Sequence, residues 1–204
     1  MSELSELLRV LLEPAAVRYG IDLGTSGRLL ASYADRLLAW NQRINLTGAR
    51  DLETLALEHI ADAFPLVPHL APSARCIDVG SGAGLPGIVL AIVRSDVVFT
   101  LLEPIQKRRT FLSAVVRDLG LARVTVLGDR LNAHVAGRGR EAYDAAISRA
   151  VFPLAEWLEL GRRLVCPGGA VLGFAGSREE AVPAGAARVP YDVGAGPRVI
   201  VVGR

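Results

Sequence analysis

The sequence predicts an α/β protein in which a mostly parallel sheet follows a helical N-terminal extension and ends in an antiparallel hairpin. Three patterns indicate this class. Apolar residues recur at helical intervals over residues 1–72, short β-branched runs alternate with helical stretches over most of residues 73–204, and glycine and proline separate the last two apolar runs. We therefore expect a helical extension at 1–72 and a sheet domain at 73–204.

Three helices are expected in the extension. Thr25 or Ser26 is the candidate N-cap of the second helix and Asp51 that of the third, because their side-chain oxygens can accept from a free backbone N–H. The prolines between 65 and 72 are expected to end the third helix. The apolar stripe of the first helix consists of Leu4, Leu7, Leu8, Leu11 and Leu12. The other two inner faces are expected from Leu29, Leu30, Tyr33, Leu37, Leu38 and Trp40, and from Leu52, Leu55, Ile60 and Phe64.

The sheet domain is expected to begin near Ala74, where the period changes from helical to extended. Apolar strands that alternate with helices favour a parallel sheet covered on both faces. The expected strands are Cys76–Val79, Val97–Leu102, Val124–Leu127, Ala145–Ser148 and Ala170–Phe174, with helices at 86–94, 106–119 and 153–164. The hairpin is expected from Ala187–Tyr191 and Arg198–Val202.

Composition narrows the class of protein. Hydrophobic residues make up 51% of the 204 residues and charged residues 22%, which is typical of a compact folded chain. Residues 1–72 carry six Arg against nine acids and residues 73–204 seventeen Lys and Arg against twelve, so the second part is consistent with a phosphate-rich partner but not specific for one. Cys76 and Cys166 are expected to be buried free thiols. We expect a cytoplasmic monomer with no metal and no membrane segment.

The most informative segment is residues 76–87, which read Cys-Ile-Asp-Val-Gly-Ser-Gly-Ala-Gly-Leu-Pro-Gly. An expected strand ends at Val79, three alternate glycines follow, and a helix is expected to begin near Pro86. Glycines allow a sharp turn and a close ligand, and free N–H groups at a helix start attract anionic groups. Asp78 and Glu103 end the first and second strands. The segment therefore predicts a nucleotide-type binding site.

Two ligands fit this loop. Gly82, Gly84 and Gly87 match the G-x-G-x-x-G pattern of dinucleotide sites, with Glu103 placed for ribose hydroxyls. The tighter spacing from Gly80 to Gly84, with Asp78 just before it, is more typical of S-adenosylmethionine sites. The sequence favours the methyl donor over a nicotinamide cofactor, and a plain tight turn is the bland alternative.

Other polar residues have weaker signals. Asp129 and Arg130 follow the third strand, where such folds contact adenine, and Arg149 follows the fourth strand at the ligand-binding edge. The cations at 107–109 are expected on a solvated helix face, with phosphate contact as the alternative, and His69 and His134 are expected at the surface. Trp40 and Trp157 lie on helical stripes and are expected in the core.

Short blocks along the chain resemble one family. They are Trp40-Asn41, Asn45-Leu46-Thr47, His59-Ile60, the loop at 78–87, Leu102-Glu103, Lys107-Arg108, Phe111-Leu112, Leu119-Gly120 and Ser148-Arg149-Ala150. In this order they are similar to the 16S ribosomal RNA guanine-N7 methyltransferases, also called glucose-inhibited division protein B. The resemblance covers roughly residues 5 to 204.

The resemblance implies a Rossmann-like class I methyltransferase, S-adenosyl-L-methionine as donor, and a guanine of small-subunit ribosomal RNA, free or in an assembling subunit, as acceptor. The implied donor-binding residues are Asp78, Gly80, Ser81, Gly82, Gly84, Leu85, Glu103, Pro104, Asp129, Arg130 and Arg149. The candidate catalytic residues are Arg149, His59 and Asn45, with Thr47 expected nearby.

Two positions depart from the family pattern. Glu58 stands before His59 where the family usually has arginine, and Ala175 follows the fifth strand where the family usually has lysine. These changes motivate two alternatives: a methyltransferase that acts on another RNA or a small molecule, and a donor-binding module that binds RNA without catalysis.

Overall fold

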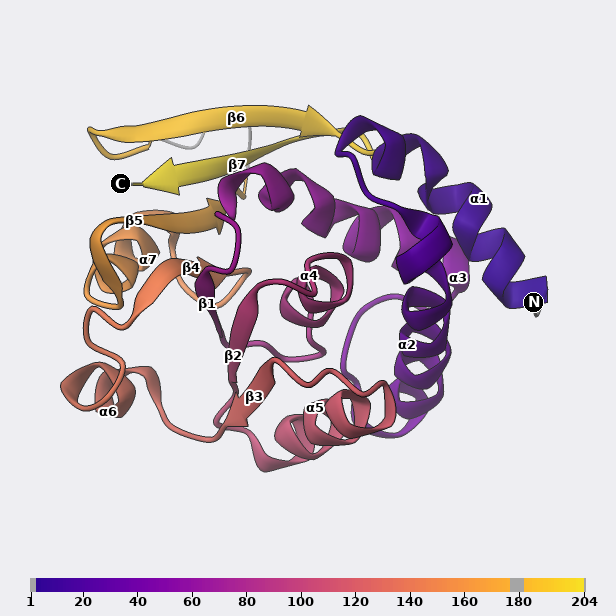
Figure 1. The fold of residues 1–204 in the computed structure, drawn as a ribbon, viewed down its shortest axis with the longest axis horizontal. Helices are drawn as coiled ribbons and strands as arrows, with labels where there is room; N and C mark the ends of the chain where they lie inside the picture. Colours follow the sequence, from indigo (N-terminus) through magenta and orange to yellow (C-terminus); the bar gives the residue numbers. More distant parts are fainter. Residues whose placement is uncertain (1–2, 177–181, 204) are drawn as a thin grey trace.

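A computed structural model describes residues 3–176 and 182–203, which form one seven-stranded sheet with helices on both faces (Figure 1). Strands β1 to β5 pair in parallel and β7 pairs antiparallel with β5 and β6, in the spatial order β3-β2-β1-β4-β5-β7-β6. The α/β class and the C-terminal hairpin are therefore confirmed. The strands are β1 (Arg75–Val79), β2 (Val98–Leu102), β3 (Val124–Leu127), β4 (Tyr143–Ser148), β5 (Val165–Phe174), β6 (Ala186–Asp192) and β7 (Pro197–Gly203).

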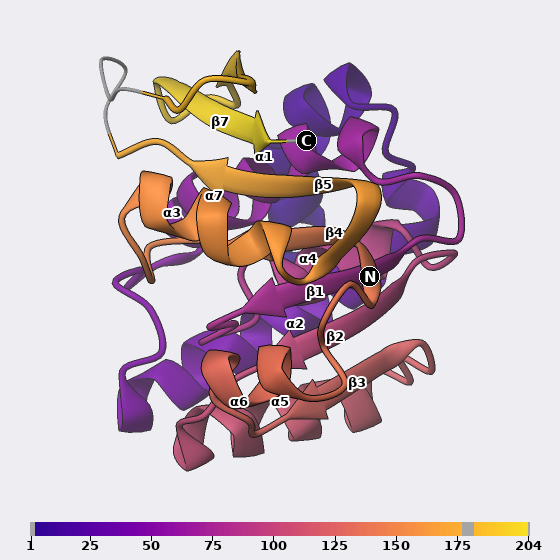
Figure 2. The ribbon, with the colours of Figure 1, turned by 90° about the vertical axis from the view of Figure 1, so that its left-hand side faces the viewer.

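Helices cover the two faces unequally. Figure 2 shows α6 and α7 in front of the strands, with α1, α2 and α4 behind them. Alternate residues of β1 divide between the two hydrophobic clusters, because successive side chains of a strand point to opposite faces: Cys76 joins the α1–α5 side and Ile77 the α7 side. The helices are α1 (Glu3–Arg18), α2 (Leu23–Ile44), α3 (Leu52–Leu55), α4 (Gly87–Val93), α5 (Gln106–Asp118), α6 (Leu131–Ala136) and α7 (Leu154–Arg162).

The N-terminal helices pack as an apolar layer against the sheet. Leu8 and Leu12 of α1 are buried, but Leu7 is 51% exposed, so the predicted stripe is narrower than five leucines; the side chain of Leu4 lies outside the described residues. The predicted cap of α2 is wrong. Asp22 caps this helix by accepting from the Gly24 N–H at 2.8 Å, and the Thr25 hydroxyl donates to the same carboxylate. The division at residue 72 stays a prediction.

The third helical segment continues past Pro65 and Pro68, two of the three prolines that were expected to end it, and ends at His69. Asp51 caps α3 as predicted, accepting from the Thr54 N–H at 2.7 Å. The chain then winds through a π-helix, η1 (Ala56–Ile60), and a 3₁₀-helix, η2 (Ala61–His69), which contains Pro65 and Pro68. Proline removes one backbone donor without stopping this tighter winding, which is why the segment does not end at Pro65.

The remaining elements match the predicted strands and helices within a few residues, with three differences. Helix α6 was not predicted, β5 begins at Val165 instead of Ala170, and Cys166 is half-buried beside the Asp144 carboxylate whereas Cys76 is buried as expected. Trp157 is buried, and Trp40 packs on Phe111, as expected of core residues.

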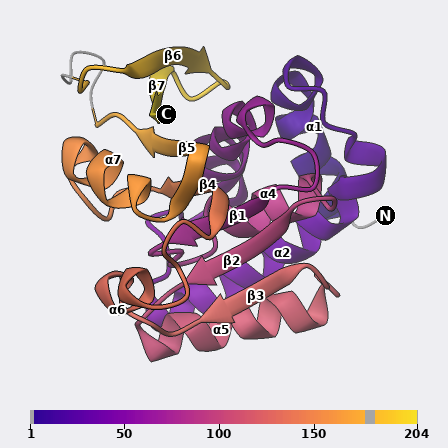
Figure 3. The same cartoon turned by 60° about the vertical axis from the view of Figure 1, so that its left-hand side comes forward.

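The strand order places a crevice at one edge of the sheet. From β1 the chain proceeds outward to β2 and β3, and then returns to β4 on the other side of β1 (Figure 3). Ligands of open α/β sheets bind at such a reversal, outside the carboxyl ends of the strands. Here those ends carry the loops that follow Val79, Leu102 and Ser148.

Candidate active site

The glycine loop requires glycine at its alternate positions. Gly80, Gly82 and Gly84 have φ values of +71°, +57° and +88°, the left-handed region that side chains disfavour. A Cβ on Gly80 would lie 2.5 Å from Cγ2 of Val151, and one on Gly84 would lie 2.4 Å from Cγ1 of Ile88. The loop therefore holds its backbone close to the β4 loop on one side and to α4 on the other.

Asp78, at the end of β1, holds both ends of the glycine loop through hydrogen bonds. Its carboxylate is buried and accepts from the Gly87 N–H at 3.1 Å, which ties the end of β1 to the start of α4. The Ser81 hydroxyl donates to the Asp78 carbonyl at 2.8 Å. Burial raises the pKa of the Asp78 carboxyl to about 7. An acid with such a pKa beside a crevice is a typical functional-site candidate.

Glu103 joins the second strand to the loop, as the sequence predicts. One carboxylate oxygen accepts from the Gly82 N–H at 2.9 Å and the other from the Ile105 N–H at 2.8 Å. The side chain is buried, so these two hydrogen bonds fix it at the floor of the crevice.

A cavity of about 420 Å³ opens beside Glu103. This volume is typical of a small-molecule site. Of the predicted donor-binding residues, those that line the cavity are Gly80, Glu103, Pro104, Asp129 and Arg130, whereas Asp78, Ser81, Gly82, Gly84, Leu85 and Arg149 lie outside its lining. The remaining lining residues are Val79, Leu102, Ile105, Arg108, Leu131, Val151 and Phe152.

Three of these lining residues were missed or misplaced from the sequence. Val151 and Phe152 come shortly after Arg149 in the sequence and form an apolar part of the cavity wall. Val151 is 46% exposed, and an exposed apolar side chain of this kind could be recognised only in the structure. Arg108 was expected on a solvated face, yet it lines the cavity and its Nε atom is buried without a hydrogen-bond partner in the described part of the chain. Of the cations at 107–109, Lys107 is exposed, whereas Arg108 and Arg109 are half-buried.

Asp129 is held by a buried histidine. His134 was expected at the surface, but its ring is buried, with Nδ1 3.3 Å from the Asp129 carboxylate and Nε2 2.9 Å from the Tyr143 hydroxyl. The Arg138 guanidinium, which donates to Asp129 at 3.1 Å, and then His134 hold the pKa of Asp129 below its usual value. His69, the other histidine expected at the surface, is half-buried.

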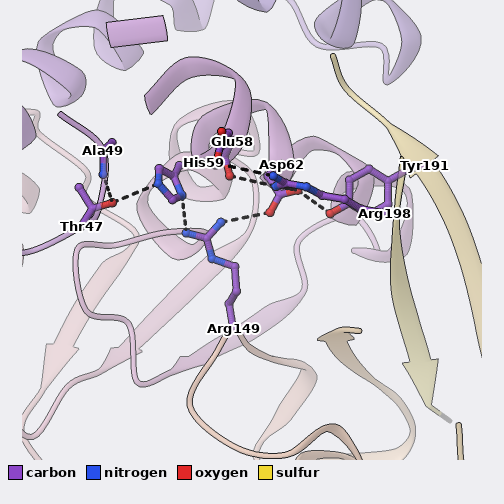
Figure 4. A network of polar contacts seen from close by, with 8 residues as sticks. All are labelled: Thr47, Ala49, Glu58, His59, Asp62, Arg149, Tyr191 and Arg198. Atoms are coloured by element: carbon purple, nitrogen blue, oxygen red, sulfur yellow. Dashed lines mark hydrogen bonds and ion pairs between the residues drawn. The ribbon is translucent and has the colours of Figure 1, made fainter. Parts of the chain in front are cut away.

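A second cluster of polar side chains surrounds Arg149, close to the same edge (Figure 4). The guanidinium donates to the Asp62 carboxylate at 3.1 Å and to Nδ1 of His59 at 3.1 Å. Arginine has no acceptor atom, so Nδ1 must be unprotonated and the proton of the neutral ring lies on Nε2. Nε2 then donates to the Thr47 hydroxyl, 3.2 Å away. Burial and then the Arg149 charge lower the pKa of His59, which keeps the ring neutral.

Asp62 is the centre of this cluster, which we call the Asp62 network: Thr47, Glu58, His59, Asp62, Arg149, Tyr191 and Arg198. Its side chain is 4% exposed, accepts from Arg198 at 2.9 Å and from Arg149, and also accepts a short hydrogen bond from the Tyr191 hydroxyl. Glu58 lies 3.9 Å from Arg198. The sequence pointed to Thr47, His59 and Arg149 but missed Asp62 itself, and also Tyr191 and Arg198, which come from the hairpin.

Asn45 has a structural explanation beside its predicted catalytic role. It is the exposed C-cap of α2, with a left-handed φ of +47°. The neighbouring Asn41 is buried and arranges the loop: its amide donates to the carbonyls of Thr47 and Ala49, and its oxygen accepts from the N–H groups of Leu46 and Thr47. The catalytic role of Asn45 stays a prediction.

We expect Asn41→Ala to lower the free energy of unfolding by about 2–4 kcal/mol, because four hydrogen bonds are lost and buried backbone groups are left unpaired. Displacement of Thr47 should also weaken methyl transfer. Chemical denaturation checks the first effect. Gln42→Ala, at the next and exposed position, should leave stability within about 0.5 kcal/mol. Equal stabilities of the two variants would contradict the role of Asn41.

The described residues contain neither a candidate metal-binding group nor a helix that could cross a membrane. Within residues 3–176 and 182–203, no group of three or more His, Cys, Asp or Glu could hold a metal ion. No described helix has the length and apolar character that a membrane crossing needs.

An open α/β sheet with a glycine loop after β1, a buried acid after β2, and β7 inserted antiparallel between β5 and β6 has the arrangement of the class I methyltransferase fold. The structure is similar to a SAM-dependent methyltransferase from Aquifex aeolicus, with a TM-score of 0.53 and 19% identity over 74% of this chain and 93% of that one. It is also similar to precorrin-6y C5,15-methyltransferase from Geobacter metallireducens, with a TM-score of 0.52 and 12% identity over 79% and 91% of the two chains.

A model of the GidB family, rRNA small subunit methyltransferase G, matches residues 27–188, and the chain belongs to this family. It is 40% identical over 158 residues to the ribosomal RNA small subunit methyltransferase G of Anaeromyxobacter dehalogenans, covering 77% of this chain and 73% of that protein. The protein of the same name from Chromobacterium violaceum is 41% identical over 148 residues, which cover 72% and 69% of the two chains. The family resemblance inferred from the sequence is confirmed.

Proposed function

We propose that this protein transfers the methyl group of S-adenosyl-L-methionine to N7 of a guanine in 16S ribosomal RNA. The observation that carries the proposal is the convergence of the glycine loop, Glu103 and Arg149 at one edge of the sheet in a chain of the methyltransferase G family. Membership of that family favours the methyl donor over the nicotinamide alternative. We expect the protein to act as a cytoplasmic monomer without a metal ion.

The donor is assigned to the cavity beside Glu103. The Glu103 carboxylate is suited to the ribose hydroxyls, Asp129 and Arg130 to adenine, and the loop from Gly80 to Gly84 to the rest of the molecule. Arg108 brings an unpaired buried Nε to the same wall, which a polar atom of the donor could satisfy. When bound, the donor supplies a methyl group on a sulfonium, which is already activated for displacement.

The acceptor needs orientation more than proton removal. N7 of guanine carries a free lone pair, so no general base has to act before attack. The neutral His59 and the Arg149 guanidinium, held by Asp62, are suited to position the guanine base and the neighbouring phosphates of the RNA backbone. Alignment of nucleophile, methyl carbon and leaving sulfur can contribute several kcal/mol, roughly 7 or more in well-oriented systems.

The two departures from the family pattern weaken the case for the usual RNA docking surface but leave this mechanism intact. The Glu58 carboxylate is half-exposed and lies 3.9 Å from Arg198, so a cation is still present beside it. Ala175 is joined to β7 through its N–H, which donates to the Val199 carbonyl at 3.0 Å. Neither residue lines the donor cavity. A different acceptor therefore remains the second candidate, and an inactive RNA-binding module the third.

Deletion of the gene is expected to remove 7-methylguanosine from the small-subunit RNA, as read by mass spectrometry. The wild-type gene should restore it, whereas Gly82→Asp should lower the modification rate roughly a hundredfold or more by displacing the loop. At φ +57° the new side chain is strained and places a charge next to Glu103, whose carboxylate accepts from the Gly82 N–H.

A matched control is Gly168→Asp, at an exposed glycine with φ +83° near the opposite end of β5, which should restore modification fully. Unchanged modification after deletion would contradict the 16S assignment and direct the search to another acceptor. Donor binding without turnover on any ribosomal substrate would leave the inactive module as the function.

A further inference from the structure

One contact links the N-terminal helices to the donor loop. Tyr33 of α2 is fully buried, and its hydroxyl donates to the carbonyl of Ala83 at 2.8 Å, fifty residues away in sequence. Ala83 lies between Gly82 and Gly84, both of which have positive φ. Tyr33 therefore contacts the residue that separates the last two glycines of the loop.

The geometry of the peptide bond makes this contact more than core packing. The Ala83 carbonyl and the Gly84 N–H belong to one planar unit, so they rotate together. The Gly84 N–H donates to the Ser81 carbonyl at 2.6 Å. The peptide is thus held at both ends, by Tyr33 at its oxygen and by Ser81 at its N–H. Gly84, which follows this peptide, has wide conformational freedom, so the peptide would otherwise rotate at a lower cost than one followed by a residue with a side chain.

The Tyr33 hydroxyl lies near charged residues of both the donor loop and the Asp62 network. Burial raises the pKa of Tyr33, and the opposing charges of Arg149 and Asp78 are the other influences on it. Helix α2 also carries Asn41, about two turns further along, whose amide orders the loop that holds Thr47. One rigid helix thus contacts the donor loop and the loop on the acceptor side.

We propose that Tyr33 is a positioning residue for the methyl donor, which fixes the Ala83–Gly84 peptide in the orientation that the donor requires. The inference rests on the proposed function, because it names the donor as the ligand of the loop. It goes beyond the sequence motif, since the residue lies on α2 and is not among the residues that line the cavity. A purely structural tyrosine would affect stability alone.

Tyr33→Phe tests this directly, because it keeps the ring that fills the core and removes only the hydroxyl. We expect the Kd for S-adenosylmethionine, measured by calorimetry on the full chain, to rise about tenfold, the cost of one buried hydrogen bond. The KM for the donor should rise in parallel, while kcat and the KM for small ribosomal subunits stay within about twofold. Tyr19→Phe is the control: Tyr19 is half-buried outside the loop and should retain wild-type affinity.

Each outcome separates this inference from the proposed function. If the wild type binds no S-adenosylmethionine, the proposed function fails and this inference with it. If the wild type binds and Tyr33→Phe binds equally well, only this inference is overturned, even if the variant melts earlier. Hydrogen exchange of the wild-type Gly84 amide needs no variant: we expect strong protection, and exchange as fast as that of the exposed Gly168 would overturn the proposal.

Discussion

Asp62→Ala is expected to lower the free energy of unfolding by about 3 kcal/mol and to reduce methyl transfer at least tenfold. The carboxylate is 4% exposed and faces two guanidinium groups, Arg149 at 19% and Arg198 at 31% exposure. Removal of a buried partner leaves uncompensated charge, which costs about 3–5 kcal/mol, and the partial exposure of both cations favours the lower value. Arg149 also loses the contact that orients it toward His59.

Urea denaturation and a methylation assay measure the two effects. Asp35→Ala removes the same charge from an exposed position of α2. It should change the free energy of unfolding by no more than about 0.5 kcal/mol and leave the rate of methyl transfer at the wild-type level. Asp62→Asn should recover part of the stability, because its amide oxygen can still accept from one arginine. An Asp62→Ala protein as stable as the wild type would show that the network contributes no net stability.

Asp78→Asn is expected to stabilise the protein at pH 8 while weakening donor binding. Burial raises the pKa of Asp78 to about 7, above its ordinary value of 3.8. The folded state then binds this proton more tightly than the unfolded chain, so the free energy of unfolding falls as pH rises from about 4 to about 7, by as much as about 4 kcal/mol. Asparagine cannot ionise and can still accept from the Gly87 N–H, so the variant avoids this cost.

The stability gain should therefore be large at pH 8 and nearly absent at pH 4, as measured by chemical denaturation of both proteins at each pH. Asp35→Asn should give no such difference. Donor affinity should fall about tenfold at pH 8 on this substitution, because we propose that the Asp78 carboxylate beside the glycine loop compensates the donor's ammonium group. A variant with the same advantage at both pH values would contradict the raised pKa.

Much of the fold follows from local patterns in the sequence. Strands β1 to β4 are short apolar runs bounded by breakers, and their periodicity is read without tertiary information. The cap of α2 was misplaced because Thr25 and Asp22 are both good caps, and only the folded backbone shows that the Asp22 carboxylate is the group that accepts from the Gly24 N–H. Helix α6 has six residues, too few for a helical period to be recognised.

The contact between the glycine loop and Glu103 could be predicted from the sequence, whereas the contacts around Asp62 could not. Gly80 to Gly84 and Glu103 lie within a single strand–helix–strand unit, so spacing along the chain is informative about spacing in space. Tyr191 and Arg198 reach Asp62 from 129 and 136 residues away, and no sequence spacing encodes that approach. The burial of His134 was also invisible, because it depends on Tyr143 across a loop.

The long reach from Asp62 to the hairpin has a consequence for the order in which the protein matures during synthesis. Every described part of the donor cavity lies between Val79 and Phe152, so that cavity can form on a growing chain. The Asp62 network needs Tyr191 and Arg198, which emerge after all the other elements described here. Contacts of such high sequence separation form late and slowly. If the cavity binds the donor and the Asp62 network orients the acceptor, as proposed above, a nascent chain becomes able to bind its donor before it can orient an acceptor.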